Sequence, residues 1–301
     1  MSLSLFWHIR IAKAFKYLIG TIILPLNLLA QATTSLSLNS GVERNSLSWS
    51  IAGNVDGKSP NVLSELKFKN LTRFGSQLAG EIEIRKLKLG AAISFYKTLY
   101  GNGTDIDYKE DDRQIQSYSL DFKSNFGHSG NLGIQAAYKT FTTNHTYIAI
   151  GGSYSYRMEQ YTLHSDELTD LNSKYKINLN SYGPSVHFGY TPSKNLRLIY
   201  VISFSMLNYS ADADWNLFEN YQHPRSFSHS ANGYSFHNVL EFSKSIYSYF
   251  DLFLLTGLRI DNTRKGVDQL FYKSGAIDIT QFNGANLTAF NIALGCKFYL
   301  N

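Results

Sequence analysis

Residues 250–261 read Phe-Asp-Leu-Phe-Leu-Leu-Thr-Gly-Leu-Arg-Ile-Asp, and this stretch decides the fold class. Its even positions are apolar apart from one threonine, whereas its odd positions include Arg259 and two aspartates. A period of two is typical of a β-strand with one apolar and one polar face. The same alternation recurs in residues 87–96, 234–242 and 292–300. These segments together predict an all-β protein.

The composition supports strands and excludes several classes of protein. The 301 residues include 21 Tyr and 20 Phe, and aromatic residues favour strands. Hydrophobic residues make up 44% and charged residues 17%, which is too apolar for a disordered chain. The single cysteine, Cys296, excludes an intramolecular disulfide and any paired-cysteine zinc or redox site. The net charge of +5 is small and not concentrated in one basic tract, so we expect no nucleic-acid partner.

The N-terminal segment has the pattern of a secretory signal. Basic residues Arg10, Lys13 and Lys16 precede an apolar run over residues 17–30, and small residues follow in Ala30-Gln31-Ala32. We therefore predict a signal peptide over residues 1–32, with an uncleaved membrane anchor as the alternative. No later run reaches the roughly 18 apolar residues that a transmembrane helix needs, so any further crossing must use strands.

The polar faces of the strands favour a membrane barrel over a secreted β-sandwich. Both folds alternate, but a barrel in an outer membrane places its apolar face against lipid and can carry Arg, Lys and Glu in a wet lumen. Closure also removes the exposed edges of the aromatic strands. We therefore predict a ten-stranded antiparallel transmembrane β-barrel in the outer membrane. Its last strand should turn five residues toward lipid, namely Ile292, Leu294, Cys296, Phe298 and Leu300.

The connections between strands alternate in length, as they do in bacterial barrels. Short turns are predicted at residues 127–130, 191–195 and 244–248. Long extracellular loops are predicted near residues 53–60, 101–113, 157–173, 212–230 and 262–285. No composition shift marks a second domain, so residues 33–301 should form one barrel with five long extracellular loops.

The order and spacing of several short motifs resemble one family. The motifs are Ser35–Gly41, Leu63–Asn70, Leu89–Tyr108, Ile148–Tyr154 and Leu294–Phe298. In this order they resemble the omptins, which are ten-stranded outer-membrane endopeptidases. The resemblance implies a catalytic Asp-x-Asp pair at Asp105 and Asp107. It also implies an Asp-x-His pair on the opposite wall, which here reads Asp212-Ala213-Asp214. An aspartate therefore stands where the family has its histidine.

This departure changes the expected chemistry of the site. A carboxylate is a poor base near neutral pH unless its pKa rises, whereas an imidazole is well suited to that role. The four aspartates could raise one pKa by mutual repulsion, or could hold a divalent cation. Among the histidines, His223, His229 or His237 could fold back to replace the missing base. The remaining alternative is that all four aspartates are solvated loop residues.

The alternation of the two faces along each strand adds a requirement for the facing of these aspartates. Alternation from Leu87 would place Asp105 and Asp107 on the lipid side, so a bulge at Gly101-Asn102-Gly103 is needed to turn them inward. No equally clear site for a bulge precedes Asp212 and Asp214 in the sequence.

Three functions are compatible with these features. The first is a structural or surface-interaction protein in which proteolysis is weak or lost. The second is an endopeptidase that uses the aspartates, for which dibasic peptides are the test substrates. The third, a pore, is disfavoured because side chains fill most of a ten-stranded lumen. We expect no cofactor; the expected partners are outer-membrane lipid and a peptide or protein at the extracellular mouth.

Overall fold

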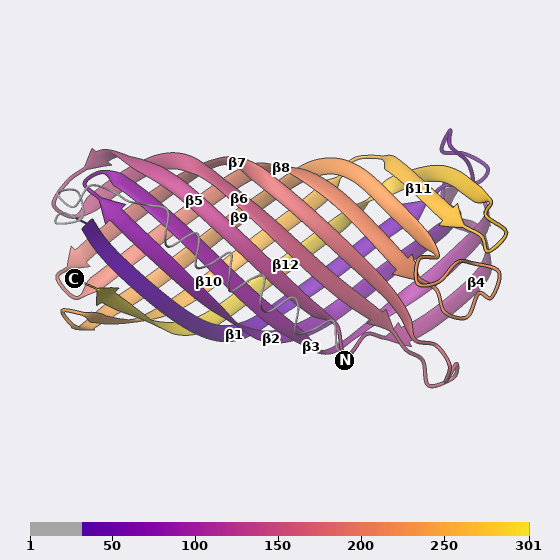
Figure 1. Ribbon diagram of the computed structural model, residues 1–301, viewed down its shortest axis with the longest axis horizontal. Helices are drawn as coiled ribbons and strands as arrows, with labels where there is room; N and C mark the ends of the chain where they lie inside the picture. The colour runs from indigo at the N-terminus through magenta and orange to yellow at the C-terminus, as the bar shows by residue number, and fades with distance from the viewer. Residues whose placement is uncertain (1–31, 301) are drawn as a thin grey trace.

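The computed structural model describes residues 32–300 as one closed antiparallel barrel (Figure 1). The described elements are β1 (Ala32–Ile51), β2 (Ser64–Ile84), β3 (Leu87–Glu110), η1 (Asp111–Arg113), β4 (Gln114–Lys123), β5 (His128–Thr142), β6 (Thr146–Leu163), β7 (Ser173–Ser193), β8 (Leu196–Asp214), β9 (Phe227–Tyr247), β10 (Phe250–Thr263), β11 (Gly266–Phe271) and β12 (Ile277–Leu300). Pairing of β1 with β12 closes the sheet. No helix within residues 32–300 is long and apolar enough to cross a membrane. The predicted signal peptide lies outside the described residues, except for Ala32.

The wall contains ten strands, as predicted. The structure has twelve labelled strands because two of the wall strands are interrupted. β4 and β5 pair with successive parts of β3, so together they form the fourth wall strand. β10 and β11 likewise pair with successive parts of β12 and form the ninth. The turn predicted at 127–130 is therefore wrong, because these residues join β4 to β5 within one wall strand.

The two ends of the barrel carry different connections. Tight turns at residues 85–86, 143–145, 194–195 and 248–249 gather at one end. The other end, on the right in Figure 1, carries the segments 52–63, 111–113, 164–172, 215–226 and 272–276. Several of these are shorter than predicted, because β3, β6 and β12 continue far into the stretches expected to be loops.

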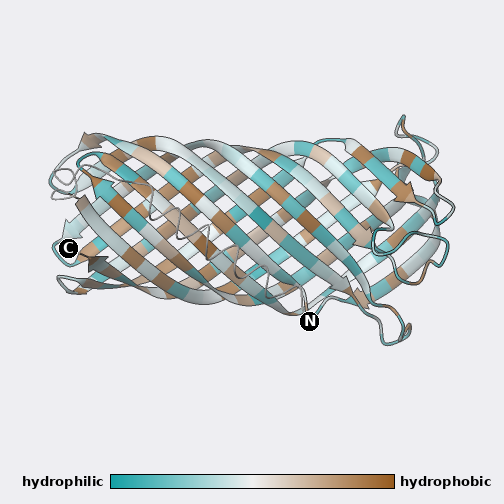
Figure 2. Ribbon diagram, in the orientation of Figure 1, coloured by the Kyte–Doolittle hydropathy of each residue, from teal (hydrophilic) through white to brown (hydrophobic). Residues whose placement is uncertain are grey.

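The polarity of the wall inverts about half-way along its length. On β8 the outward row runs Ile202, Phe204, Met206, Asn208 and Ser210, while the inward row runs Ser203, Ser205, Leu207, Tyr209 and Ala211. Figure 2 shows the alternation of hydrophobic and hydrophilic residues along each strand. We call the part nearer the tight turns, with apolar outward residues, the turn half, and the other part the loop half. The boundary lies at Met206 on β8 and at Phe290 on β12.

The last strand confirms the predicted lipid face in the turn half. Leu294 is 70% exposed, and Ile292, Phe298 and Leu300 are also exposed on the outside of the barrel. Cys296 lies in the same outward row and is partly exposed. Lys297 and Tyr299 point inward, where Lys297 Nζ lies 2.6 Å from Glu241 Oε1. Beyond Phe290 the outward row turns polar at Thr288 and Asn286.

The loop half has an apolar interior that resembles the core of a soluble protein. Its buried cluster includes Leu47, Trp49, Leu66, Phe68, Phe122, Tyr161, Tyr175, Ile177, Leu207, Tyr209, Phe227 and Phe282. These side chains come from eight strands, so they tie the wall together across the barrel axis. The burial of so many aromatic rings is the main stabilising contribution in this half.

A layer of buried ion pairs separates the apolar core from the lumen below it. Arg73 Nη1 lies 2.8 Å from Glu159 Oε2 and 3.2 Å from Glu43 Oε1. Arg157 contacts Glu159 and also pairs closely with Asp261. With Arg259 nearby, three arginines face three carboxylates, so the layer is balanced in charge. Such pairing is what makes buried charges tolerable.

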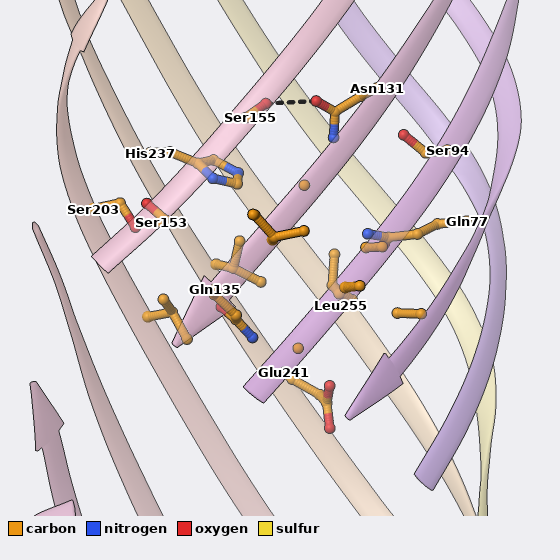
Figure 3. Close-up of a pocket in the computed structure, with 18 of the residues that line it drawn as sticks. Gln77, Ser94, Asn131, Gln135, Ser153, Ser155, Ser203, His237, Glu241 and Leu255 are labelled. Carbon is orange, nitrogen blue, oxygen red and sulfur yellow. Dashed lines mark hydrogen bonds between the residues drawn. The ribbon is translucent and has the colours of Figure 1, made fainter. Parts of the chain in front are cut away.

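Below this layer the turn half contains a polar cavity of about 320 Å³. Figure 3 shows Gln77, Ser94, Asn131 and His237 among the side chains around it. Ser155 donates a hydrogen bond of 2.6 Å to Asn131 within the cavity wall. The lumen is therefore lined by polar side chains where the outer wall meets lipid, as expected for an outer-membrane barrel.

Candidate functional site

Asp105 and Asp107 point into the loop half because of a bulge in β3. Arg73 of β2 pairs with Thr98, whereas Thr72 pairs with Tyr100, so Leu99 is an extra residue in β3. Even-numbered residues such as Thr98 face inward before the bulge, and Asp105 faces inward after it. The bulge therefore has the predicted effect, but it occurs at Leu99 rather than in the glycine-containing segment 101–103.

Asp105 is a buried carboxyl in an apolar setting. It is 8% exposed, and in the sheet it stands between Leu66 and Leu120, which are both buried. Burial, together with the neighbouring Asp107 carboxylate, raises the pKa of Asp105 to about 7. A hydrogen bond from the Trp215 side chain acts in the opposite direction. A carboxyl with a pKa near 7 can exchange a proton near neutral pH.

Asp107 lies nearer the rim of the barrel. Burial raises its pKa, while a hydrogen bond from Ser64 lowers it. Tyr118 of β4 is its neighbour in the sheet, and burial together with both carboxylates raises the pKa of that phenol. The two aspartates thus form a partly shielded acidic pair below the β3–β4 hairpin.

Asp212 and Asp214 occupy the outer face of the wall instead. They alternate with Ala211 and Ala213, which are buried in the core. Asp212 Oδ1 lies 2.6 Å from Arg225 Nε. The structure does not bring these two residues to the Asp105–Asp107 pair, which corrects the expectation that all four carboxylates line the mouth. No bulge precedes them in β8, so they face outward, as strict alternation along the strand predicts.

The histidine next to this outer pair also lies at the surface. His223 Nδ1 is 2.7 Å from Asp214 Oδ1, and the two side chains are 32% and 28% exposed. In the β7–β8 pairing, Asp214 stands opposite Lys174 and Asp212 opposite Lys176. Each outer aspartate therefore belongs to a solvated patch of mixed charge, which is an ordinary feature of a strand face in water.

A second imidazole–carboxylate pair lies deep in the core, and the sequence did not reveal it. His229 Nε2 lies 3.1 Å from Asp268 Oδ1, and both side chains are buried. His229 Nδ1 lies 2.7 Å from the hydroxyl oxygen of Tyr175, which is 2.5 Å from that of Tyr209. Burial lowers the pKa of His229, although Asp268 opposes this effect. Alternation in residues 266–271 could have placed Asp268 inward, but nothing local pairs it with a histidine 39 positions earlier (268 minus 229).

Aromatic rings separate His229 from the acidic pair. Trp215, which donates to Asp105, packs edge-on against Phe227 with ring centroids 4.8 Å apart. Phe227 in turn lies 5.1 Å from the His229 ring, and Phe282 stacks on that ring at 4.3 Å. The imidazole is thus enclosed by rings and is not exposed to water.

The remaining candidate groups do not form a metal or cofactor site in the described residues. Within residues 32–300, no three His, Cys, Asp or Glu side chains gather closely enough to hold a metal ion. His237 does not fold back to the acidic pair, but lines the turn-half cavity with Glu241 (Figure 3).

Comparison with known proteins identifies the family and supports the fold. The profile of the Protochlamydia outer membrane protein family, Pom, matches residues 37–299. The chain belongs to this family. No curated protein sequence matches the chain. The Pom family profile, the closed ten-stranded wall and its apolar outer belt agree that the protein is an outer-membrane β-barrel.

Solved structures show what this Pom protein resembles in three dimensions. The outer membrane protease OmpT from Escherichia coli superposes with a TM-score of 0.70 at 12% identity, covering 89% of this chain and 97% of that one. The translocator domain of the autotransporter NalP from Neisseria meningitidis gives 0.38 at 10% identity, covering 88% of each chain. At 12% identity the likeness to OmpT shows the fold alone. The correspondence of Asp214 with the omptin histidine therefore stays a prediction.

Proposed function

We propose that this Pom protein is a surface-exposed structural and interaction protein of the outer membrane, in which proteolysis is weak or absent. The observation that carries the proposal is the position of the imidazoles. His229 is enclosed by Phe227 and Phe282, and His223 sits on the outer wall against Asp214. Hydrolysis by an activated water needs a base within hydrogen-bond reach of that water, and neither imidazole reaches the Asp105–Asp107 pair.

The loop half provides a rigid platform for such a role. Its outer face is polar, and its interior is packed with aromatic and aliphatic side chains. Strands that extend far beyond the lipid belt raise the long segments above the membrane surface. Loops on a rigid scaffold are the usual sites of recognition.

One specific observation favours the second candidate, an aspartate-dependent endopeptidase. Burial raises the pKa of Asp105 to about 7, which suits a general acid or base. In that function the ionised carboxylate would act as the base, so cleavage would increase as pH rises through about 7. A pore is disfavoured, because the ion-pair layer and the apolar core lie across the lumen.

A cleavage assay separates the first two functions. Purified protein in lipid nanodiscs is incubated with fluorogenic dibasic peptides between pH 5 and 9, beside an Asp107→Ala variant. We expect no cleavage above the level of the variant at any pH. Robust cleavage by the unmodified protein that is lost in Asp107→Ala would contradict the proposal and support the endopeptidase.

A further inference from the structure

The fourth wall strand leaves a gap in the loop half of the barrel. β4 pairs with β3 along its length, but on its other side it is joined to the wall by only one bridge. There Lys123 N–H donates to His164 C=O at 2.7 Å, and His164 N–H donates to Lys123 C=O at 2.9 Å. β6 ends at Leu163, and the wall resumes only where β7 begins. Figure 1 shows β4 at the loop end of the barrel.

The backbone groups along this side of β4 lack a ladder partner. Because both groups of Lys123 point to the open side, alternation directs those of Asp121 and Ser119 the same way. Among the described residues, no backbone hydrogen bond is made to these groups from the open side. Both residues are exposed, so an extended chain could approach them. A strand with unpaired groups is a template for the addition of another strand.

Charge around the open edge is acidic on both faces of β4. Asp121 is exposed on the outer face, and the adjoining 165–172 segment carries Asp166, Glu167 and Asp170. Lys123, the cation at the bridge itself, is already bound by Asp166. On the inner face, Asp107 lies opposite Tyr118 in the β3–β4 pairing. A strand added at this edge would therefore lie beside carboxylates on the outer face, with Asp107 one strand further away on the inner face.

We infer that the open edge of β4 binds an extended cationic peptide segment of an extracellular partner as an additional antiparallel strand. The bound segment lies beside β4, in the position that β6 leaves after His164. It runs in the same direction as β6, because the bridge between His164 and Lys123 is antiparallel. Main-chain hydrogen bonds to Ser119 and Asp121 supply affinity, and lysine or arginine side chains on both faces supply selectivity. This inference rests on the proposed function, because it names the partner class of the same surface protein.

A second copy of the chain is a poorer occupant of this edge. Two identical strands that pair antiparallel are related by a two-fold axis perpendicular to their sheet. In a barrel wall that axis lies in the plane of the membrane, so the second barrel would be upside down. Copies in one membrane share one orientation, so β4 cannot pair antiparallel with itself there.

The test uses synthetic peptides and the full-length protein in lipid nanodiscs. The probe is a fluorescent octapeptide in which lysine and valine alternate, and binding is measured by fluorescence anisotropy. We expect the probe to bind, and a copy with alternate backbone amides methylated to bind about tenfold more weakly, since it loses hydrogen bonds to the edge. A glutamate–valine peptide should not bind.

Variants of the protein locate the site. Ser119→Pro removes one edge N–H, and proline is tolerated on an edge strand, so we expect binding about tenfold weaker. Asp121→Lys should weaken binding severalfold, whereas Glu219→Lys, which makes the same charge change in the 215–226 segment, should leave it within about twofold. Circular dichroism checks that each variant is folded. If Ser119→Pro does not fold, the methylated peptide decides the result.

Four outcomes overturn the inference. Three are no binding of the lysine peptide, equal binding of the methylated peptide, and equal binding by folded Ser119→Pro. The fourth is an equal effect of the two charge variants, which would assign the binding to general electrostatic attraction. Mass spectrometry of the recovered peptide separates this inference from the proposed function. Cleavage of the peptide contradicts the proposed function, while absence of both binding and cleavage contradicts only the inference.

Discussion

The turn half and the loop half are parts of one continuous wall, yet their polarities are opposite. In the turn half the outward residues are apolar and the lumen holds a polar cavity of about 320 Å³. In the loop half most outward residues are polar, with exceptions such as Val267 and Ile279, and the interior is an apolar core. The strand geometry is the same in both, so the difference follows from where water lies. Apolar side chains face lipid in one half, and face each other in the half that stands in water.

Strand length explains why one protein needs both arrangements. A tilted strand crosses the hydrocarbon layer in about 9–11 residues. β8 has 19 residues and β12 has 24, so each has enough residues for a second segment beyond the lipid. The layer formed by Arg73, Arg157, Glu159 and their partners lies where the interior changes from wet to dry. On one side the layer borders the polar cavity through Arg157 and Arg259, and on the other side Arg73 packs over the Tyr161 ring.

The largest predicted effect tests the core of the loop half. Phe282 is fully buried and stacks on His229 and Tyr209. Phe282→Ala should lower the free energy of unfolding by about 3–5 kcal/mol, because it removes a ring and leaves a cavity. Urea unfolding in lipid vesicles measures this change. Ser203→Ala in the wet lumen is the control and should stay within about 0.5 kcal/mol. A loss below about 1 kcal/mol for Phe282→Ala would mean that the loop half is not packed as a core.

The second effect is the pH dependence that Asp105 contributes in the loop half. The pKa of Asp105 rises from 3.8 to about 7 on folding, so the folded state holds its proton more tightly. The resulting stability is complete below about pH 4 and is lost as pH rises through about 7. A difference of about three pKa units corresponds to at most about 4 kcal/mol.

Thermal unfolding between pH 4 and 8 measures this dependence. The difference in stability between the unmodified protein and Asp105→Asn isolates the Asp105 contribution, and it should shift against the unmodified protein by up to about 4 kcal/mol as pH rises from 4 to 8. Asp121→Asn, which changes an exposed carboxylate on the neighbouring β4, should behave like the unmodified protein. Identical pH curves for Asp105→Asn and the unmodified protein would contradict the buried setting of Asp105.

The third prediction compares matched outward residues on one strand. Leu294 and Thr288 both face outward on β12, in the turn half and the loop half respectively. Leu294→Arg should cost about 2–4 kcal/mol if the residue lies near the middle of the bilayer. Thr288→Arg should cost less than about 0.5 kcal/mol, because its surroundings are aqueous. Urea unfolding in vesicles compares the two, and equal costs would mean that the lipid belt extends past Phe290.

The sequence predicted the turn half well and the loop half poorly, for a physical reason. Alternation in residues 292–300 identifies the lipid face directly, because each outward apolar residue faces lipid and needs no partner from a distant strand. The loop half depends on contacts between distant strands, such as the one between His229 and Asp268. Bulges add to the difficulty, because one extra residue at Leu99 reverses the facing of Asp105. Alternation counted from Leu196 still gives the correct outward facing of Asp212, because no bulge interrupts β8.

The smallest predicted effect concerns the outer aspartates and returns to the difference between the two faces of the wall. If the omptin resemblance extended to the site, Asp214→His would restore the family residue and produce cleavage of dibasic peptides. Asp214 instead lies on the outer face, where its carboxylate contacts His223 and stands opposite Lys174. An imidazole placed there would still lie on the opposite side of the wall from Asp105. We therefore expect the variant to cleave no faster than the unmodified protein, within about twofold.

The same assay needs a variant that changes the inner face. Trp215→His places an imidazole at the residue that donates to Asp105, on the inner side of the wall. If restoring an imidazole near the acidic pair can support any hydrolysis, this variant should show it, whereas Asp214→His should not. General base catalysis contributes about 10²–10⁴-fold, so even a partial effect would be visible above the background rate. Cleavage gained by Asp214→His alone would show that β8 turns its aspartates inward in solution. The omptin-like site formed by both aspartate pairs would then be present at the mouth of the barrel.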